Sequence, residues 1–181
     1  MVEPEIPENT GFIARLASNF EADLRIVKPD FNLSEARQTA NKSQEKIRES
    51  KIFEEFEKSI KDLEHVVGTK PGKGSPLGNF QPRQNSSLVI GRESSGLKNS
   101  ELELCDSAVY IETGDYSSIN QSHAAAILMH RFHTKQKGKA DVEKLEAIKQ
   151  DVGNKTMELI RRGSPTVKEV KAVVAEVKER N

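Results

Sequence analysis

Short apolar runs that alternate with helical patterns limit the folds open to this 181-residue chain more than any other feature. The runs with the length of buried strands are 24–27, 65–69, 88–90 and 108–111. The segments with helical periodicity are 9–20, 34–50, 52–64 and 120–134, and a capping box at Ser100 and Glu103 indicates a further short helix. Strands that alternate with helices predict βα units, and therefore an α/β fold with a mostly parallel sheet and flanking helices.

The pattern after Gly138 is helical only, with helices predicted over about 140–162 and 166–179. Residues 131–181 carry 13 basic and 8 acidic side chains, whereas the whole chain has a formal net charge of zero. A basic segment on a neutral body is compatible with contact to nucleic-acid phosphates, and equally with an ordinary solvated helical face. We therefore expect one domain at residues 1–137 and a short, basic helical extension at residues 138–181.

The apolar runs, the N-terminal residues and the cysteine content all favour a cytoplasmic location. No run approaches the roughly 18 apolar residues that cross a bilayer. The first residues, MVEPEIPENTG, are acidic and proline-rich, unlike a signal peptide. Cys105 is the single cysteine and cannot form an internal disulfide. We expect a cytoplasmic protein without a membrane partner.

Three polar segments stand where a strand gives way to a loop or where a helix begins. They are residues 9–15 (NTGFIAR), 90–97 (IGRESSGL) and 116–122 (YSSINQS). Ligands of parallel α/β sheets bind at the carboxyl ends of the strands, because loops and helix N-termini meet there. The three segments are therefore the candidate site.

Taken singly, each segment also has an ordinary structural explanation. Gly91 and Gly96 could permit a tight turn. Asn9 and Asn120 could cap helices, with Arg15 on the solvent side of its helix. Neither the G-x-G-x-x-G dinucleotide fingerprint nor the P-loop string occurs in the chain, so neither supports a nucleotide site.

Together and in this order, the segments resemble the three motifs of the SpoU (TrmH) branch of the SPOUT RNA methyltransferases. The resemblance rests on GRESSGL, NSELELCD and YSSINQSHA, and runs from Val2 to about Phe132. Within that branch the chain is most similar to the TrmJ-type subfamily, which methylates cytidine or uridine riboses at position 32 of the tRNA anticodon loop. The resemblance implies methyl transfer from S-adenosylmethionine to a tRNA 2′-hydroxyl. It also implies a deep trefoil knot and a homodimer whose active site draws on both subunits.

The same matching implies which residues form the site. The residues near the cofactor would be Thr69, Lys70, Pro71, Gly91, Ile111, Ser117, Ser118 and Ile119. The catalytic set would be Asn9, Arg15, Glu93, Ser118 and Asn120. Gly91 would let the backbone approach the ligand closely. The family's usual assignment makes Arg15 the base that activates the ribose. Because a guanidinium stays protonated in proteins, we expect Arg15 instead to bind the phosphate beside the target ribose with its fork of N–H groups.

Other functions remain open at this point. The same chemistry on ribosomal RNA, a non-catalytic RNA-binding relative and an unrelated nucleotide-binding α/β domain are the alternatives. No metal is expected, because His130 and His133 have helical spacing but no further ligand beside them. His123, close to the third segment, could serve as a reserve proton acceptor, with a solvated or packing histidine as the alternative. We expect no DNA partner.

Overall fold

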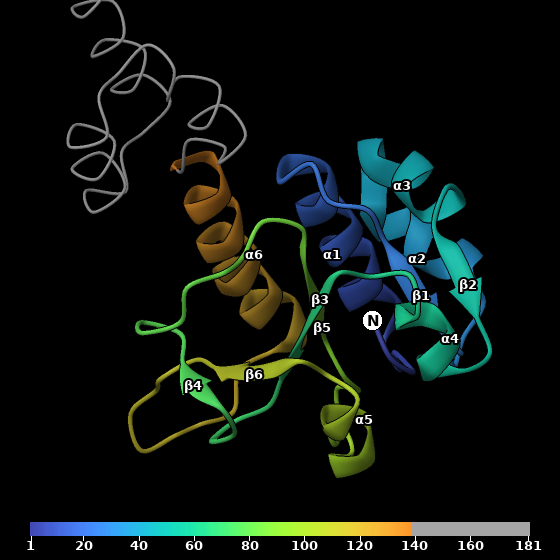
Figure 1. Ribbon diagram of the computed structural model, residues 1–181. Coiled ribbons are helices and arrows are strands. Elements are labelled where there is room, and N and C mark those ends of the chain that lie inside the picture. The colour runs from blue at the N-terminus through green and yellow to red at the C-terminus, as the bar shows by residue number, and fades with distance from the viewer. Residues whose placement is uncertain (139–181) are drawn as a thin grey trace, which may run out of the picture. The chain divides into compact units, whose positions relative to one another are not determined.

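The computed structural model describes residues 1–138, and its strands form two sheets (Figure 1). The smaller sheet pairs β1 (Arg25–Val27) with β2 (Lys51–Phe53). The larger sheet has the order β4-β6-β3-β5, with bounds β3 His65–Thr69, β4 Ser75–Pro76, β5 Ser86–Val89 and β6 Ser107–Tyr110. Every ladder between these strands is parallel, which confirms the predicted α/β fold with a parallel sheet. The trefoil knot that the resemblance implies stays a prediction, and the helices predicted over 140–162 and 166–179 lie outside the described residues.

Residues 1–3 run between the two sheets and connect their hydrogen bonding. Val2 forms a parallel bridge with Val27, and the amide of Glu3 donates to the Val27 carbonyl at 2.8 Å. On the other side, the amide of Val2 donates to the Ile90 carbonyl, directly after β5, at 2.8 Å. The segment that leads into the first polar motif is therefore held beside the strand that leads into the second.

The helices have local causes in the sequence. Among residues 1–138 they are α1 Pro7–Asn19, α2 Leu33–Ala40, the 3-10 helix η1 Asn41–Ser43, α3 Gln44–Arg48, α4 Phe56–Ile60, α5 Asn99–Glu103 and α6 Gln121–Gly138. Pro7 suits the first position of α1 because its fixed φ is already helical. The side chain of Asn32 caps α2 by accepting from the amide of Ser34 at 2.9 Å. Gly11 lets α1 approach α2 closely, since a Cβ there would lie 2.5 Å from the Ala36 carbonyl oxygen.

Residues Met1–Phe132 form one compact unit whose core contains three groups of buried apolar side chains. The group nearest the second motif consists of Val2, Val27, Val66, Val89 and Leu97. Leu97 is fully buried, and such burial contributes about 1.5–3 kcal/mol. It anchors the end of the loop that follows β5. No helix within residues 1–138 is long and apolar enough to span a bilayer.

The helix predicted over 52–64 is wrong in its first half. The structure forms strand β2 up to Phe53 and then the five-residue helix α4. Phe53, Phe56, Ile60 and Leu63 have helical spacing, yet all four pack against the same buried group. A strand followed by a short helix satisfies this burial as well as one helix would, so the spacing alone misassigned the strand.

Two other segments differ from their predicted structure. The helix predicted over 34–50 is interrupted at Asn41, whose φ of 53° is incompatible with a continuous right-handed helix. Residues 70–78, to which the sequence analysis assigned neither a strand nor a helix, contain β4, where Ser75 pairs with Val109. A strand of two residues has too few side chains to produce a detectable alternation.

One of the two helix caps near the site agrees with the sequence interpretation. Asn120 caps α6, because its Oδ1 accepts a hydrogen bond of 2.9 Å from the backbone amide two residues later. The capping box predicted at Ser100 and Glu103 is wrong. Helix α5 begins after Lys98, and the carboxylate of Glu101 accepts from the Lys98 amide at 2.7 Å.

An ion pair far from the motifs gives a test of the fold in solution. Asp62 accepts from Nη1 and Nη2 of Arg25, at 2.5 and 2.9 Å, and these bonds lower the pKa of Asp62 from 3.8 to about 2. A carboxylate with a depressed pKa stabilises the fold above its ordinary pKa and loses that contribution as pH falls through the folded-state value. We expect Asp62→Asn to lower the free energy of unfolding modestly at pH 6, with the difference from wild type shrinking between pH 4 and 2. Urea unfolding across that range checks this, and a difference that is constant with pH would contradict it.

Candidate active site

Three side chains from the three motif segments form one hydrogen-bonded line. Asn120, at the start of α6, donates from Nδ2 to Oδ1 of Asn9 at 3.2 Å. Asn9, in the first turn of α1, donates from its own Nδ2 to Oε1 of Glu93 at 3.2 Å. The line joins positions 84 and 111 residues apart in the sequence. The fold therefore brings Asn9, Glu93 and Asn120 together, at the edge of the larger sheet where its strands end.

Glu93 supplies the cap that α1 lacks locally. Ile6 is the N-cap residue of α1 and has no capping side chain. The carboxylate of Glu93 accepts from the amides of Glu5, at 2.8 Å, and Ile6, at 3.3 Å, and so places negative charge at the positive end of the helix. The alternative that Asn9 caps this helix is wrong, because Asn9 lies inside the first turn. The Glu93 carboxylate accepts the hydrogen bonds from Glu5, Ile6 and Asn9, a role that orients α1.

Glu5 makes the reciprocal contact. Its carboxylate accepts from the amide of Ser94 at 2.9 Å and from the Ser94 hydroxyl at 2.7 Å. Hydrogen bonding to Ser94 lowers the pKa of Glu5 below its ordinary value. Each segment thus places a carboxylate on backbone amides of the other. The N-terminal segment and the loop after β5 are therefore joined by hydrogen bonds to a carboxylate on each side.

The loop after β5 closes on itself at Gly91. A Cβ at Gly91 would overlap the backbone of Gly96 and Leu97, and Gly96 has a φ of 66° that favours glycine. In addition, Nε2 of Gln121 donates to the Gly91 carbonyl at 2.7 Å. The need for glycine at 91 therefore arises from the loop's own closure, which agrees with the tight-turn interpretation, and the close approach of a ligand stays a prediction.

The remaining cofactor candidates lie on loops at the ends of β3 and β6. Thr69 ends β3 and donates from Oγ1 to the Val89 carbonyl at 2.8 Å. Nζ of Lys70 donates to the Leu97 carbonyl at 2.7 Å, which ties the loop after β3 to the loop after β5. Ile111 follows β6 and packs, half-buried, against an apolar group of the core. These positions share the edge of the sheet at which Gly91 lies.

The last four cofactor candidates are Pro71, Ser117, Ser118 and Ile119. Pro71 and both serines are exposed, and Ile119 is half-buried. In the part of the chain that the structure describes, neither Ser117 nor Ser118 hydrogen-bonds to the line of Asn9, Glu93 and Asn120. Both serines lie in the loop directly before α6, and their role at the cofactor stays a prediction.

Arg15 stands apart from the line within one chain. It lies six residues after Asn9 on α1, which at about 3.6 residues per turn is a different face of the helix. Its side chain is exposed, and its guanidinium carbon lies 5.9 Å from the centre of the Phe12 ring. Among residues 1–138, no hydrogen bond connects Arg15 to Asn9, Glu93 or Asn120.

Two buried polar residues beside the motifs have no place in the sequence-based site. They are Arg92 and Gln121, each 8% exposed. An arginine between a glycine and a glutamate in a loop has the sequence signature of a surface cation. A glutamine after a capping asparagine looks equally ordinary. Nothing local distinguishes either from a solvated side chain.

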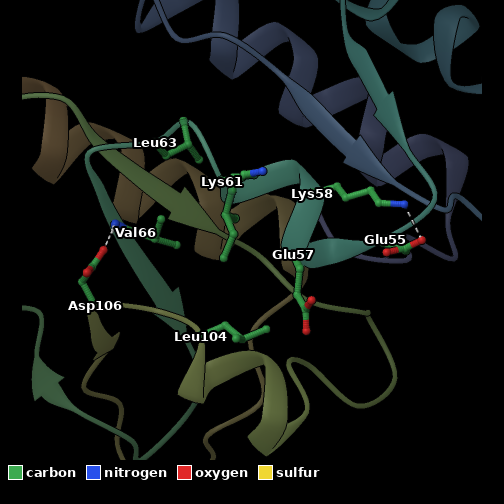
Figure 2. A pocket seen from close by; sticks show the side chains of 9 residues that line it. Glu55, Glu57, Lys58, Lys61, Leu63, Val66, Leu104 and Asp106 are labelled. Carbon is green, nitrogen blue, oxygen red and sulfur yellow. Dashed lines mark hydrogen bonds and ion pairs between the residues drawn. The ribbon is translucent and has the colours of Figure 1, made fainter.

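A separate pocket lies at the opposite edge of the larger sheet (Figure 2). Its lining combines apolar and charged side chains, namely Glu55, Glu57, Lys58, Ile60, Lys61, Leu63, Val66, Leu104 and Asp106. Val66 lies near the start of β3 and Asp106 directly precedes β6, whereas the candidate residues follow the ends of these strands. Asp106 accepts from the Val66 amide, and Lys58 pairs with Glu55. The pocket is therefore distinct from the candidate site. Across residues 1–138, no group of three or more His, Cys, Asp or Glu side chains is placed to hold a metal ion.

Comparison with known proteins gives one consistent result. A model described as the SpoU rRNA methylase family matches residues 1–130. The tRNA (cytidine-2′-O-)-methyltransferase TrmJ of Methanocaldococcus jannaschii is 32% identical over 171 residues, covering 83% of this chain and 74% of that protein. The TrmJ of Sulfolobus acidocaldarius is 29% identical over 164 residues, covering 82% and 70%. The SpoU methyltransferase AviRb of Streptomyces viridochromogenes, solved with AdoMet, shares the fold with a TM-score of 0.65 and 22% identity over 75% of this chain and 56% of that one.

Proposed function

This chain belongs to the SpoU rRNA methylase family, and we propose that it transfers a methyl group from S-adenosylmethionine to a ribose 2′-hydroxyl of a tRNA. The observation that carries the proposal is the meeting of Asn9, Glu93 and Asn120 at the ends of the parallel strands. The two TrmJ relatives, named as tRNA 2′-O-methyltransferases, support tRNA as the substrate class. The basic surplus of residues 131–181 suits contact with tRNA phosphates. A tRNA substrate also agrees with a cytoplasmic location.

The loops at this edge have the chemistry that S-adenosylmethionine requires. Ile111 offers an apolar wall for an adenine ring, and the exposed backbone of Ser117 and Ser118 offers hydrogen-bonding groups. Oε1 of Gln121, whose amide already holds Gly91, is buried without a hydrogen-bond partner in the described residues, so an acceptor remains beside the loop. We propose that Thr69, Lys70, Pro71, Gly91, Ile111, Ser117, Ser118 and Ile119 surround the cofactor. When bound, S-adenosylmethionine supplies an activated methyl group on a sulfonium.

The chain's own contribution to the reaction is alignment. A bond forms between the ribose oxygen and the methyl carbon while the methyl–sulfur bond breaks, and the hydroxyl proton leaves to a phosphate oxygen or to water. Holding the reactants in line is worth up to about 7–11 kcal/mol. Arg15, exposed and always charged, binds the phosphate beside the target ribose with two N–H groups. Asn9, Glu93 and Asn120 hold α1 against the cofactor loop, and Ser118 lies on the loop that precedes α6.

We further propose that a homodimer completes the site, because Arg15 lies away from the line of Asn9, Glu93 and Asn120 within one chain. Helices α1 and α6 lie side by side (Figure 1), in agreement with the hydrogen bond between Asn9 and Asn120 and the ring contact between Phe20 and His130. Each helix exposes a large apolar side chain, Phe12 at 43% and Ile127 at 44%. A shared apolar face on these helices would bring Arg15 of one subunit to the site of the other.

Substituting Ile127→Glu is therefore expected to weaken the dimer by about 2 kcal/mol or more, roughly 30-fold, because a buried interface anchor would become charged. Analytical ultracentrifugation measures the dimer dissociation constant, and methyl transfer should fall in parallel. Ile52→Glu is the matched control, since Ile52 on β2 is 46% exposed and lies outside this face. Dimerisation that is equal in both variants would contradict this interface.

The substrate class is tested by transfer of labelled methyl groups to a tRNA transcript and to a ribosomal RNA fragment in parallel. Incorporation into the tRNA is the expected result. Incorporation into the ribosomal fragment alone would reassign the substrate within the same chemistry. Calorimetry with S-adenosylmethionine separates an enzyme from a non-catalytic RNA-binding relative, because the latter should show no detectable affinity.

A further inference from the structure

Arg92 is a buried cation in the middle of the loop after β5. Its Nε donates to Glu3 at 2.7 Å, and its Nη1 and Nη2 donate to the two carboxylate oxygens of Glu101 at 3.0 and 2.8 Å. A buried charge is costly unless it is paired and hydrogen-bonded, so this geometry is not that of a solvated side chain. Burial opposes the charged form of Glu101, but the hydrogen bonds from Arg92 and from the Lys98 amide hold the pKa of Glu101 below its ordinary value. The paired groups Arg92 and Glu101 therefore stay ionised.

The two carboxylates that Arg92 binds belong to different parts of the site. Glu3 lies two residues before Glu5, in the segment whose amides Glu93 caps and which leads into α1. Glu101 lies in α5, at the far end of the loop. Nη1 of Arg92 also donates to the Gly96 carbonyl at 3.1 Å, at the point where the loop closes over Gly91. One side chain thus fastens the loop to itself, to α5 and to the N-terminal segment.

We infer that Arg92 is a positioning residue for methyl transfer. Its contact with Glu101 (the Glu101 arm) and its contact with Glu3 (the Glu3 arm) have separable effects. The Glu101 arm sets the shape of the loop at Gly91, and hence the affinity for the cofactor. The Glu3 arm sets where α1 stands relative to that loop, and hence the placement of Asn9 and Arg15. The inference rests on the proposed function and deepens it, since Arg92 itself touches no reacting atom.

The two arms are tested separately in the full-length chain with Glu3→Gln and Glu101→Gln, together with Arg92→Lys. Calorimetry gives the dissociation constant of S-adenosylmethionine, steady-state assays give kcat and KM for tRNA, and hydrogen–deuterium exchange reports on residues 3–9 and 91–97.

Glu3→Gln should lower kcat about 10-fold with cofactor affinity unchanged within about 2-fold, and should speed exchange in residues 3–9. Glu101→Gln should weaken cofactor binding about 10-fold and speed exchange in residues 91–97. Arg92→Lys, which loses the fork, should show both effects. Small displacements of aligned groups cost up to about 100-fold in rate, so these effects are within reach.

Asp62→Asn is the control, because it neutralises a carboxylate that, like Glu101, binds an arginine through two bonds, and because Asp62 precedes the start of β3 whereas the candidate site follows its end. It should lower stability without changing kcat or cofactor affinity. If Glu3→Gln and Glu101→Gln behave like Asp62→Asn in all three measurements, Arg92 is only structural and the inference is overturned. If the wild-type chain transfers no methyl group, the proposed function fails. The exchange data then still test whether Arg92 couples residues 3–9 to residues 91–97, and unchanged exchange in both variants would overturn that coupling.

Discussion

A Gly91→Ala variant is expected to lose detectable binding of S-adenosylmethionine and to unfold more easily than the wild type. The added Cβ would overlap the backbone of Gly96 and Leu97, which cannot move away as a flexible side chain could. Gly91 is fixed on both sides, because its carbonyl accepts from Gln121 and the preceding Ile90 carbonyl accepts from Val2. Such overpacking costs about 1–3 kcal/mol, and relief of the clash would open the loop that forms one wall of the cofactor site. Calorimetry and urea unfolding measure the two effects.

Gly114→Ala serves as the control for Gly91→Ala. Gly114 lies in the loop after β6 with open space around its α-carbon and no positive φ, so the extra methyl group should change neither stability nor cofactor affinity appreciably. Wild-type cofactor affinity in Gly91→Ala would show that the loop tolerates opening, and that the cofactor does not depend on its closure.

Arg15→Lys should lower kcat by about 100-fold or more while leaving cofactor affinity and stability close to wild type. Lysine keeps the positive charge but loses the planar fork that binds a phosphate through two bonds. The stability effect should be small because Arg15 is exposed and its one contact among the described residues is with the Phe12 ring. Single-turnover methyl transfer with saturating cofactor isolates the chemical step from binding.

Arg83→Lys is a matched control for Arg15→Lys, since Arg83 is also exposed but precedes β5, at the opposite end of the strand from the site. Its turnover should equal that of the wild type. Near-normal turnover in Arg15→Lys itself would exclude the phosphate-binding role, and would leave the guanidinium fork without a function in the reaction.

The elements that sequence analysis identified best are those with an unambiguous burial pattern. The strand predicted at 65–69 is confirmed as β3, which is buried over its first four residues and lies between β6 and β5 in the larger sheet. Strand β2 was hidden because Phe53 continues the helical spacing of α4 while its burial is satisfied from a strand. Strand β4 is too short to show any pattern. Local periodicity therefore predicts an element only when a single conformation can bury its apolar side chains.

The site shows the same limit in its polar residues. The motif segments were found because their residues follow strands or open helices, and Asn9, Glu93 and Asn120 do meet. The importance of Arg92 could not be predicted, because its partners Glu3 and Glu101 lie 89 and 9 residues away and only the fold makes them neighbours. A buried ion pair has no local sequence signal, whereas a turn or a cap does.

Methyl transfer to the ribose 2′-hydroxyl is tested most directly by mapping the modified nucleotide in a tRNA transcript and then replacing that one ribose with deoxyribose. The modified nucleotide should carry its methyl group on the sugar, and removal of the single hydroxyl should abolish incorporation while leaving tRNA binding in place. Incorporation that persists at the same nucleotide without its 2′-hydroxyl would contradict ribose methylation and, with it, the assigned role of Arg15.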